Sequence, residues 1–190
     1  MKRTILGLVA AFAFVAVGEM KIGTINMVEL VQLHPNHESN RTLVKATDKD
    51  YKAMLEKQQN ALQELADEGK KAFEEMSNPM LSATAKAAAK QKVEGIQQKL
   101  LAGQQELRIS AQRYQHDLTD LESRLLKIET DEIRAKVEEY AKKNGYDIIA
   151  DSTMLAYSKK TLDVTDEILK MMKVDPSKRK TLPKVGSPLK

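Results

Sequence analysis

The chain has 190 residues, of which 31% are charged and only 4% are aromatic, and it contains neither Trp nor Cys. Large aromatic side chains dominate thick protein cores, so their scarcity argues against a compact globular enzyme. A highly charged composition with few aromatics is typical of long helices and coiled coils. The lack of Cys excludes disulfide bonds within this sequence.

The formal net charge of +4 is concentrated at the two ends of the chain. Lys2 and Arg3 contribute two positive charges, and residues 173–190, with six basic residues and one acid, contribute five, so residues 19–172 carry −3. This distribution gives the central part no general affinity for polyanions. We therefore expect no nucleic-acid partner. The basic residues 173–190, which include three prolines, are predicted to be a disordered tail.

Residues 1–18 have the layout of a secretory signal peptide. Lys2 and Arg3 precede an uninterrupted run of apolar and small residues, and small residues lead up to a cleavage site near Gly18. The run is shorter than the roughly 20 residues that a transmembrane helix needs. We therefore expect the chain to be exported and cleaved.

A first long helix is predicted over residues 39–77. Ser39 or Asn40 can cap its start, and Pro79 ends it because proline disfavours helical geometry at the residue before it. Alternating steps of three and four residues along this segment form a heptad seam, by which one helix packs along another. The seam positions are Leu55, Gln58, Leu62, Leu65, Gly69, Ala72 and Met76.

A second long helix is predicted over residues 82–145, with Ser82 as its cap and Gly145 as a left-handed C-cap. Its apolar stripe contains a stutter at Tyr114, which unwinds a supercoil locally. Helices joined by so short a turn must lie antiparallel, so a hairpin projects with residues 77–81 at its free end. The stripe consists of Ile96, Leu100, Gly103, Leu107, Tyr114, Leu118, Leu121, Leu125, Ile128, Ile133, Val137 and Tyr140.

The remaining residues, 19–38 and 146–172, are predicted to form a small body at the base of the hairpin, which makes the fold class α+β and mostly α. A closing helix starts at Asp163 and ends near Met172. So small a body cannot bury a stable core alone, and we expect it to oligomerise. Three short strands are predicted, over residues 21–28, 146–151 and 154–157. The residues expected at the oligomer body are Ile22, Ile25, Met27, Ile148, Ile149, Leu155, Tyr157, Val164, Ile168 and Leu169.

The sequence carries no recognisable catalytic motif: it has no phosphate-binding glycine loop, nucleophile elbow or zinc-binding helix motif. His34 and His37 are spaced like a metal pair, but Pro35 lies between them and no third ligand converges on them. Capping and surface polarity explain these histidines better. We predict neither catalysis nor a metal nor a cofactor.

Apolar residues and lysines gather near the free end of the hairpin. They could simply close that end and keep it soluble. Alternatively, adaptable apolar side chains contact unfolded client proteins, and the lysines approach anionic lipid headgroups. The candidate client-binding residues are Phe73, Met76, Met80, Leu81, Ile96 and Leu100. The candidate anionic-surface residues are Lys86, Lys90 and Lys92.

Both ends of residues 19–172 resemble the Skp/OmpH family of periplasmic outer-membrane protein chaperones. The matching segments are 21–26 (KIGTIN), 146–151 (YDIIAD), Ala156-Tyr157 and 163–170 (DVTDEILK). The resemblance implies a periplasmic homotrimer whose strands form a central barrel and whose hairpins enclose unfolded outer-membrane proteins without using ATP. Family hairpins are often strongly basic, whereas residues 39–145 hold 19 basic and 18 acidic residues here.

The sequence therefore favours an ATP-independent periplasmic holdase that prevents the aggregation of unfolded outer-membrane proteins. An exported structural or tethering coiled coil that contacts the cell envelope is the alternative. A cytosolic prefoldin-like holdase shares the hairpin geometry but has no use for a signal peptide. Lipopolysaccharide remains a possible anionic partner in the first interpretation.

Overall fold

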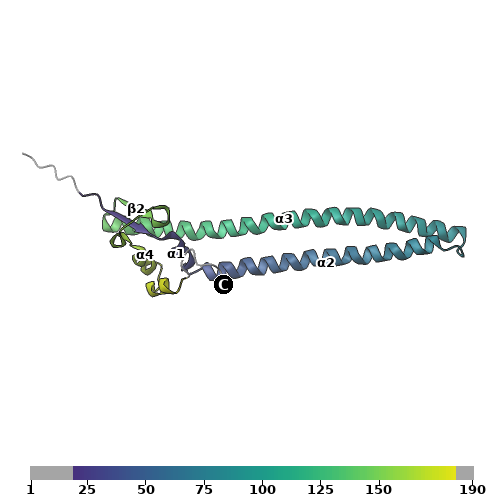
Figure 1. The fold of residues 1–190 in the computed structure, drawn as a ribbon, viewed down its shortest axis with the longest axis horizontal. Coiled ribbons are helices and arrows are strands. Elements are labelled where there is room, and N and C mark those ends of the chain that lie inside the picture. Colours follow the sequence, from purple (N-terminus) through teal and green to yellow (C-terminus); the bar gives the residue numbers. More distant parts are fainter. Residues whose placement is uncertain (1–18, 183–190) are drawn as a thin grey trace, which may run out of the picture.

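A computed structural model describes residues 19–182, which form a long two-helix hairpin attached to a small mixed body (Figure 1). The predicted fold class, α+β and mostly α, is confirmed. The predicted signal peptide and residues 183–190 of the predicted tail lie outside the described residues. The elements are β1 (Ile22–Ile25), α1 (Met27–Gln32), α2 (His37–Ser77), α3 (Ala83–Asn144), β2 (Ile148–Asp151), η1 (Ser152–Met154), η2 (Lys160–Leu162), α4 (Thr165–Met171) and η3 (Pro176–Thr181), where η marks a 3-10 helix.

The hairpin consists of α2 with 41 residues and α3 with 62 residues. At 1.5 Å per residue these helices are about 60 and 90 Å long. Ser82 caps α3 by accepting a hydrogen bond from the Ala85 amide, and Gly145 ends it in the left-handed region at φ 66°, both as predicted. Within residues 19–182, no helix has a stretch that is both apolar enough and long enough to traverse a bilayer.

The start of α2 differs from the prediction. The helix begins at His37, and Asn36 occupies the cap position without a side-chain capping bond. Ser39 and Asn40 are therefore helical residues, and the prediction that either caps the helix is wrong. The side-chain amide of Asn40 instead donates a 2.7 Å hydrogen bond to the carboxylate of Glu129 on α3, across the hairpin.

The predicted seams place most of their residues between the two helices, with Ala72 and Ile96 fully buried. The exception is Ile128, which is 52% exposed, whereas its neighbour Glu129 is only 2% exposed. Glu129 takes the inward position because His37 and Asn40 both supply hydrogen-bond partners for its carboxylate. A polar layer thus replaces the apolar seam where the hairpin joins the body.

Tyrosines pair across the hairpin at the level of the predicted stutter. The rings of Tyr51 and Tyr114 lie 4.9 Å apart between centroids. Each hydroxyl donates to an Asp of the other helix, Tyr51 to Asp117 and Tyr114 to Asp48. The hydrogen bond to Asp48 raises the pKa of Tyr114. Two reciprocal bonds of this kind oppose sliding of one helix along the other.

The body is organised around parallel pairing of β1 and β2, in the register Ile22 with Ile148 through Ile25 with Asp151. Parallel strands need a long crossover connection, and here the whole hairpin is that connection. The core beneath the strands joins segments from both ends of the chain and from α3. Its buried members are Ile25, Leu30, Ile133, Val164, Ile168 and Leu169.

Three predictions about the body are wrong. The first strand stops at Ile25 because the Asn26 side chain accepts from the Glu29 amide at 3.1 Å and starts α1, which makes Met27 helical. The third strand, 154–157, is absent from the described chain, because Asp151 caps a 3-10 turn at Thr153 instead. The first part of the predicted disordered tail, residues 173–182, is folded and contains η3.

Glycines inside the hairpin allow a test of how tightly the helices are packed. Apart from its chain neighbours and the backbone of its own helix, no described atom lies within 4 Å of the place where a Cβ on Gly95 would stand. A Cβ on Gly69 would stand 3.0 Å from Cγ2 of the buried Ile96. We expect Gly95→Ala to stabilise the chain by about 0.5–1 kcal/mol through helix propensity. Gly69→Ala should lose most of that gain, because the branched Ile96 side chain must move.

Urea unfolding monitored by helical circular dichroism, at one protein concentration, measures both changes. Equal stabilisation by the two substitutions would show that Gly69 and Ile96 are not closely packed.

Candidate functional site

Several large apolar side chains of the hairpin face away from the seam. Met80 in the turn is 90% exposed, Leu101 is 70% exposed and Phe73 is 55% exposed. Phe73 follows the buried Ala72, so it points outward from α2. The exposed apolar residues of the hairpin are Leu43, Met54, Phe73, Met80, Leu101, Ile109, Leu126 and Ile128.

The predicted client-binding residues divide into accessible and inaccessible ones. Phe73 and Met80 are exposed, and Met76, Leu81 and Leu100 are half-buried. Ile96 is 5% exposed and packs in the seam, so the closed hairpin offers it to no partner.

The structure also exposes Leu101, which the sequence reasoning missed. The signal was present in the pair Leu100-Leu101, because only one of two consecutive helical residues can face the opposite helix.

A second apolar surface lies on the body, where the sheet faces outward. Ile22 and Ile148 are register partners, so their side chains emerge on the same face of the sheet, and both are exposed. Leu155 and Tyr157 are exposed as well. We call Ile22 and Ile148 the body face. The other exposed large apolar residues of the body are Met20, Val28, Met154, Leu155 and Tyr157, of which Met20, Val28 and Met154 were not predicted.

The other predicted body residues are interior. Ile25, Val164, Ile168 and Leu169 are buried in the core of the single chain, and Met27 and Ile149 pack partly buried against it. They stabilise the chain that presents the body face rather than contacting a partner directly. Beside this face, β1 lies between β2 and the bridge residue Asp163, whereas β2 has β1 as its only strand neighbour in the described chain.

A family model described as outer membrane protein (OmpH-like) matches residues 21–172. The chain belongs to this family. The resemblance found in the sequence is thereby confirmed. Proteins of the Skp/OmpH type are chaperones without enzymatic activity, and this chain is a chaperone of that general type. A search of curated proteins finds no match.

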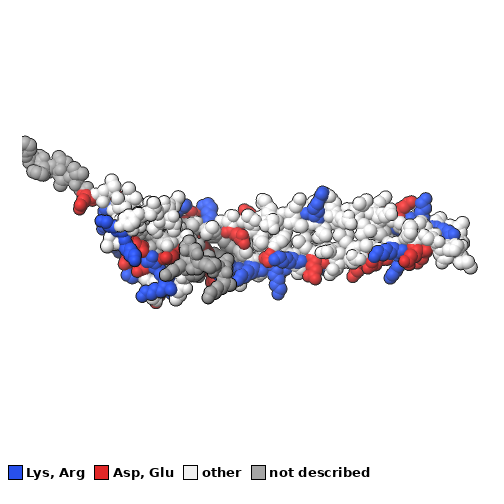
Figure 2. Space-filling view, in the orientation of Figure 1, with Lys and Arg blue, Asp and Glu red and all other residues white. Residues whose placement is uncertain are grey.

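The charges of this OmpH-like hairpin are mixed in sign along its length. Figure 2 shows acidic and basic side chains interleaved, with uncharged surface between them. Lys92 of the predicted lysine group pairs with Glu68 across the hairpin at 2.9 Å, and this hydrogen bond lowers the pKa of Glu68. Lys86 and Lys90 form no ion pair with any described residue. These two lysines are the better candidates for contact with an anionic surface.

Two histidines, His34 and His37, lie at the root of the OmpH-like hairpin, where α2 begins. His34 is buried rather than a surface residue as predicted, and its Nε2 lies 3.1 Å from Glu132 while its Nδ1 accepts from the Asn36 amide. His37 lies 3.0 Å from the buried Glu129. Among residues 19–182, no three His, Asp or Glu side chains converge as a metal site would require. The histidines therefore fasten the start of α2 to α3.

Proposed function

We propose that this OmpH-like chaperone is an ATP-independent periplasmic holdase that works as a homotrimer and keeps unfolded outer-membrane β-barrel proteins from aggregating. The observation that carries the proposal is the set of large apolar side chains exposed along the hairpin, above all Phe73, Met80 and Leu101. These side chains lie outside the seam between α2 and α3, so they are free to bury apolar surface against an unfolded client. The signal-peptide pattern of residues 1–18 and the family support a periplasmic location.

Assembly into a trimer is supported by the body face. Its apolar side chains are uncovered in the single chain, and the outer edge of β2 has no strand partner among residues 19–182, so a strand of another copy can pair with it. Covering this face in a trimer brings three hairpins together at their roots. The hairpins then surround a shared space that the exposed residues of each arm can line.

The way clients are held follows from the spacing of these residues. An unfolded barrel strand exposes alternating apolar side chains and unpaired backbone, which makes it prone to aggregate. Isolated side chains on an arm contact such a strand one at a time, and flexible methionine adapts to different sequences. Each contact is weak, so the client stays mobile and can leave without an energy source. Nearly equal numbers of acids and bases on the hairpin favour apolar over electrostatic capture.

Client holding can be tested with a denatured outer-membrane β-barrel protein diluted into buffer, with aggregation followed by light scattering. The full chain should suppress scattering, and this suppression should persist at high salt because apolar contacts dominate. The triple variant Phe73→Ser, Met80→Ser, Leu101→Ser should bind the client roughly tenfold more weakly, a loss of about 1.4 kcal/mol.

A matched control replaces exposed polar residues at similar positions, Gln97→Ser and Gln104→Ser, and should leave suppression unchanged. If the triple variant suppresses aggregation as well as the natural chain does, the proposed client surface is wrong. If the natural chain does not suppress aggregation, the proposed holdase function is wrong.

The trimer can be tested by sedimentation equilibrium. The chain should sediment as a discrete trimer, and Ile22→Asp with Ile148→Asp should reduce it to a monomer, because two charges would be buried at each interface. Both side chains are exposed in the single chain, so its fold should persist, although two like charges at paired positions cost it about 0.2–1 kcal/mol. The control Ser123→Asp adds a charge at an exposed position on α3, outside the body. Filaments that grow with concentration would instead support an exported structural or tethering coiled coil.

Anionic contact is the remaining part of the proposal, for which lipid headgroups or lipopolysaccharide could supply the phosphate. We expect the chain to float with vesicles that contain anionic lipid. Lys86→Ala and Lys90→Ala should each weaken this binding by about 1 kcal/mol. Lys92→Ala should have a smaller effect, because Lys92 is paired with Glu68. Absence of binding by the natural chain, to vesicles and to lipopolysaccharide alike, would exclude the contact.

A further inference from the structure

The chain continues beyond the family-matched region, and residues 173–182 fold back onto the body. The reversal occurs at Lys173, which adopts the left-handed conformation with φ 61°. The Val174 amide donates to the Leu169 carbonyl at 2.9 Å, and the Lys173 amide donates to the Lys170 carbonyl at 3.0 Å. These two bonds form a Schellman motif, which ends a helix and redirects the chain. Val174 then packs against the core of the body.

The next residues form a defined turn of 3-10 helix. Asp175 accepts a hydrogen bond from the Ser177 amide at 2.9 Å, and Pro176 occupies the first position of η3. Proline is favoured there because its fixed φ suits the first turn and its missing N–H needs no partner. The turn leaves Lys178 and Lys180 exposed and directs Arg179 between them toward the body.

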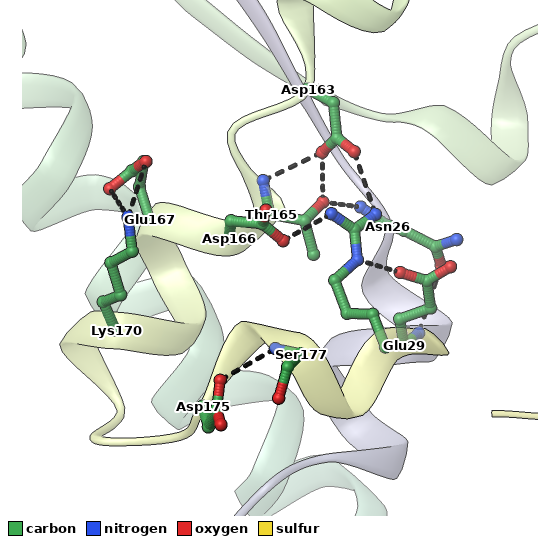
Figure 3. A network of polar contacts seen from close by, with 10 residues as sticks. Asn26, Glu29, Asp163, Thr165, Asp166, Glu167, Lys170, Asp175 and Ser177 are labelled. Carbon is green, nitrogen blue, oxygen red and sulfur yellow. Dashed lines mark hydrogen bonds and ion pairs between the residues drawn. The ribbon is translucent and has the colours of Figure 1, made fainter. Parts of the chain in front are cut away.

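Arg179 contacts three carboxylates at once. Its Nε lies 2.5 Å from Glu29, and its two terminal nitrogens lie 2.7 Å from Asp166 and 2.9 Å from Asp163. Figure 3 shows these acids converging from separate segments of the body. The Arg179 side chain is only 22% exposed. Burial disfavours its charge, but the hydrogen bonds to the three acids outweigh burial and raise the pKa of Arg179 above its ordinary value.

The acids lie on segments of the body that adjoin the two helices of the hairpin. Glu29 is on α1, the short helix that leads into α2, whereas Asp166 is on α4, which packs against α3. Asp163 extends the network inward, because it accepts from Thr165, whose hydroxyl in turn accepts from the Asn26 amide at 2.9 Å. A planar guanidinium with donors in several directions can bind three such segments, whereas a lysine ammonium lacks this geometry.

We propose that residues 173–182 are a strap that closes the body, and that Arg179 is the positioning residue by which the strap holds the hairpin at a fixed angle. The strap ties α1 to the start of α4, so the roots of α2 and α3 cannot shift independently. The proposal does not depend on client holding, because it concerns the rigidity of the single chain.

The strap is expected to stay closed at neutral and mildly acidic pH. Burial raises the pKa of Asp163, but hydrogen bonds from Thr165 and Arg179 outweigh burial and lower it below its ordinary value. A lowered pKa means that the stabilising contribution is present above the ordinary value and is lost only as the pH falls through the lowered one. Glu29 and Asp166 face the same guanidinium from the two neighbouring helices.

Hydrogen exchange on the full chain tests the strap. Arg179→Gln removes the charge and leaves three carboxylates without their cation, so amides of α1 and α4 should exchange about tenfold faster. Arg179→Lys should give an intermediate increase. Lys180→Gln makes the same charge change at an exposed neighbour and should alter exchange less than about twofold. Equal exchange rates of the α1 and α4 amides in all three variants would overturn the proposal.

The angle of the hairpin can be measured separately, because the sequence contains no Cys that would interfere with labelling. Spin labels at Lys57→Cys on α2 and Lys159→Cys on the body report one distance, with labelled chains diluted in unlabelled ones so that only pairs within a chain contribute. Arg179→Gln should broaden the distance distribution, and Lys180→Gln should not. A distribution that stays narrow with Arg179→Gln would show that the strap does not set the angle. Arg179→Lys keeps the test valid if Arg179→Gln fails to fold.

Discussion

Parallel pairing of β1 with β2 is the constraint on which the rest of this structure depends. Two parallel strands must be joined by a connection that returns to its starting level. Here that connection is the whole hairpin, so α2 leaves the body beside the place where α3 re-enters it. The body core follows from the same arrangement, since Ile133 of α3 is buried with Leu30 of α1 and Ile168 of α4. The pairing thereby anchors both arms of the hairpin to one small body.

The narrow seam between α2 and α3 explains why apolar residues remain exposed. Packing two helices requires only one stripe on each, and small residues such as Ala72 and Ala89 fill that stripe near the turn. Apolar side chains beside the stripe, such as Leu101, are not needed for helix pairing and stay outside it. A hairpin of this kind keeps its own stability separate from the surface it presents to a partner.

How much could be predicted depended on whether a feature has a local cause. The turn of the hairpin and the end of α3 were predictable because Pro79, Ser82 and Gly145 act on neighbouring backbone. The cap of α1 was local as well, since Asn26 precedes Glu29 at capping spacing, but the β-branched neighbours favoured a longer strand. Buried Glu129 and the folded strap were unpredictable, because their charges are stabilised by residues distant in sequence. The burial of Ile96 was predictable, because its place in the apolar stripe of the second helix already conflicted with a role in binding clients.

The polar contacts where the hairpin joins the body resist rotation of the long hairpin relative to the body. A force at the free end of an arm some 60 Å long exerts a large torque on the junction with the body. Apolar packing alone permits small rotations, whereas directional hydrogen bonds oppose them. Glu129 with His37 and Arg179 with Glu29 both lie where α1 and α2 join the body. For a chaperone that holds its clients by the weak contacts proposed above, a firm root would let the arms bend along their length without separating at the base.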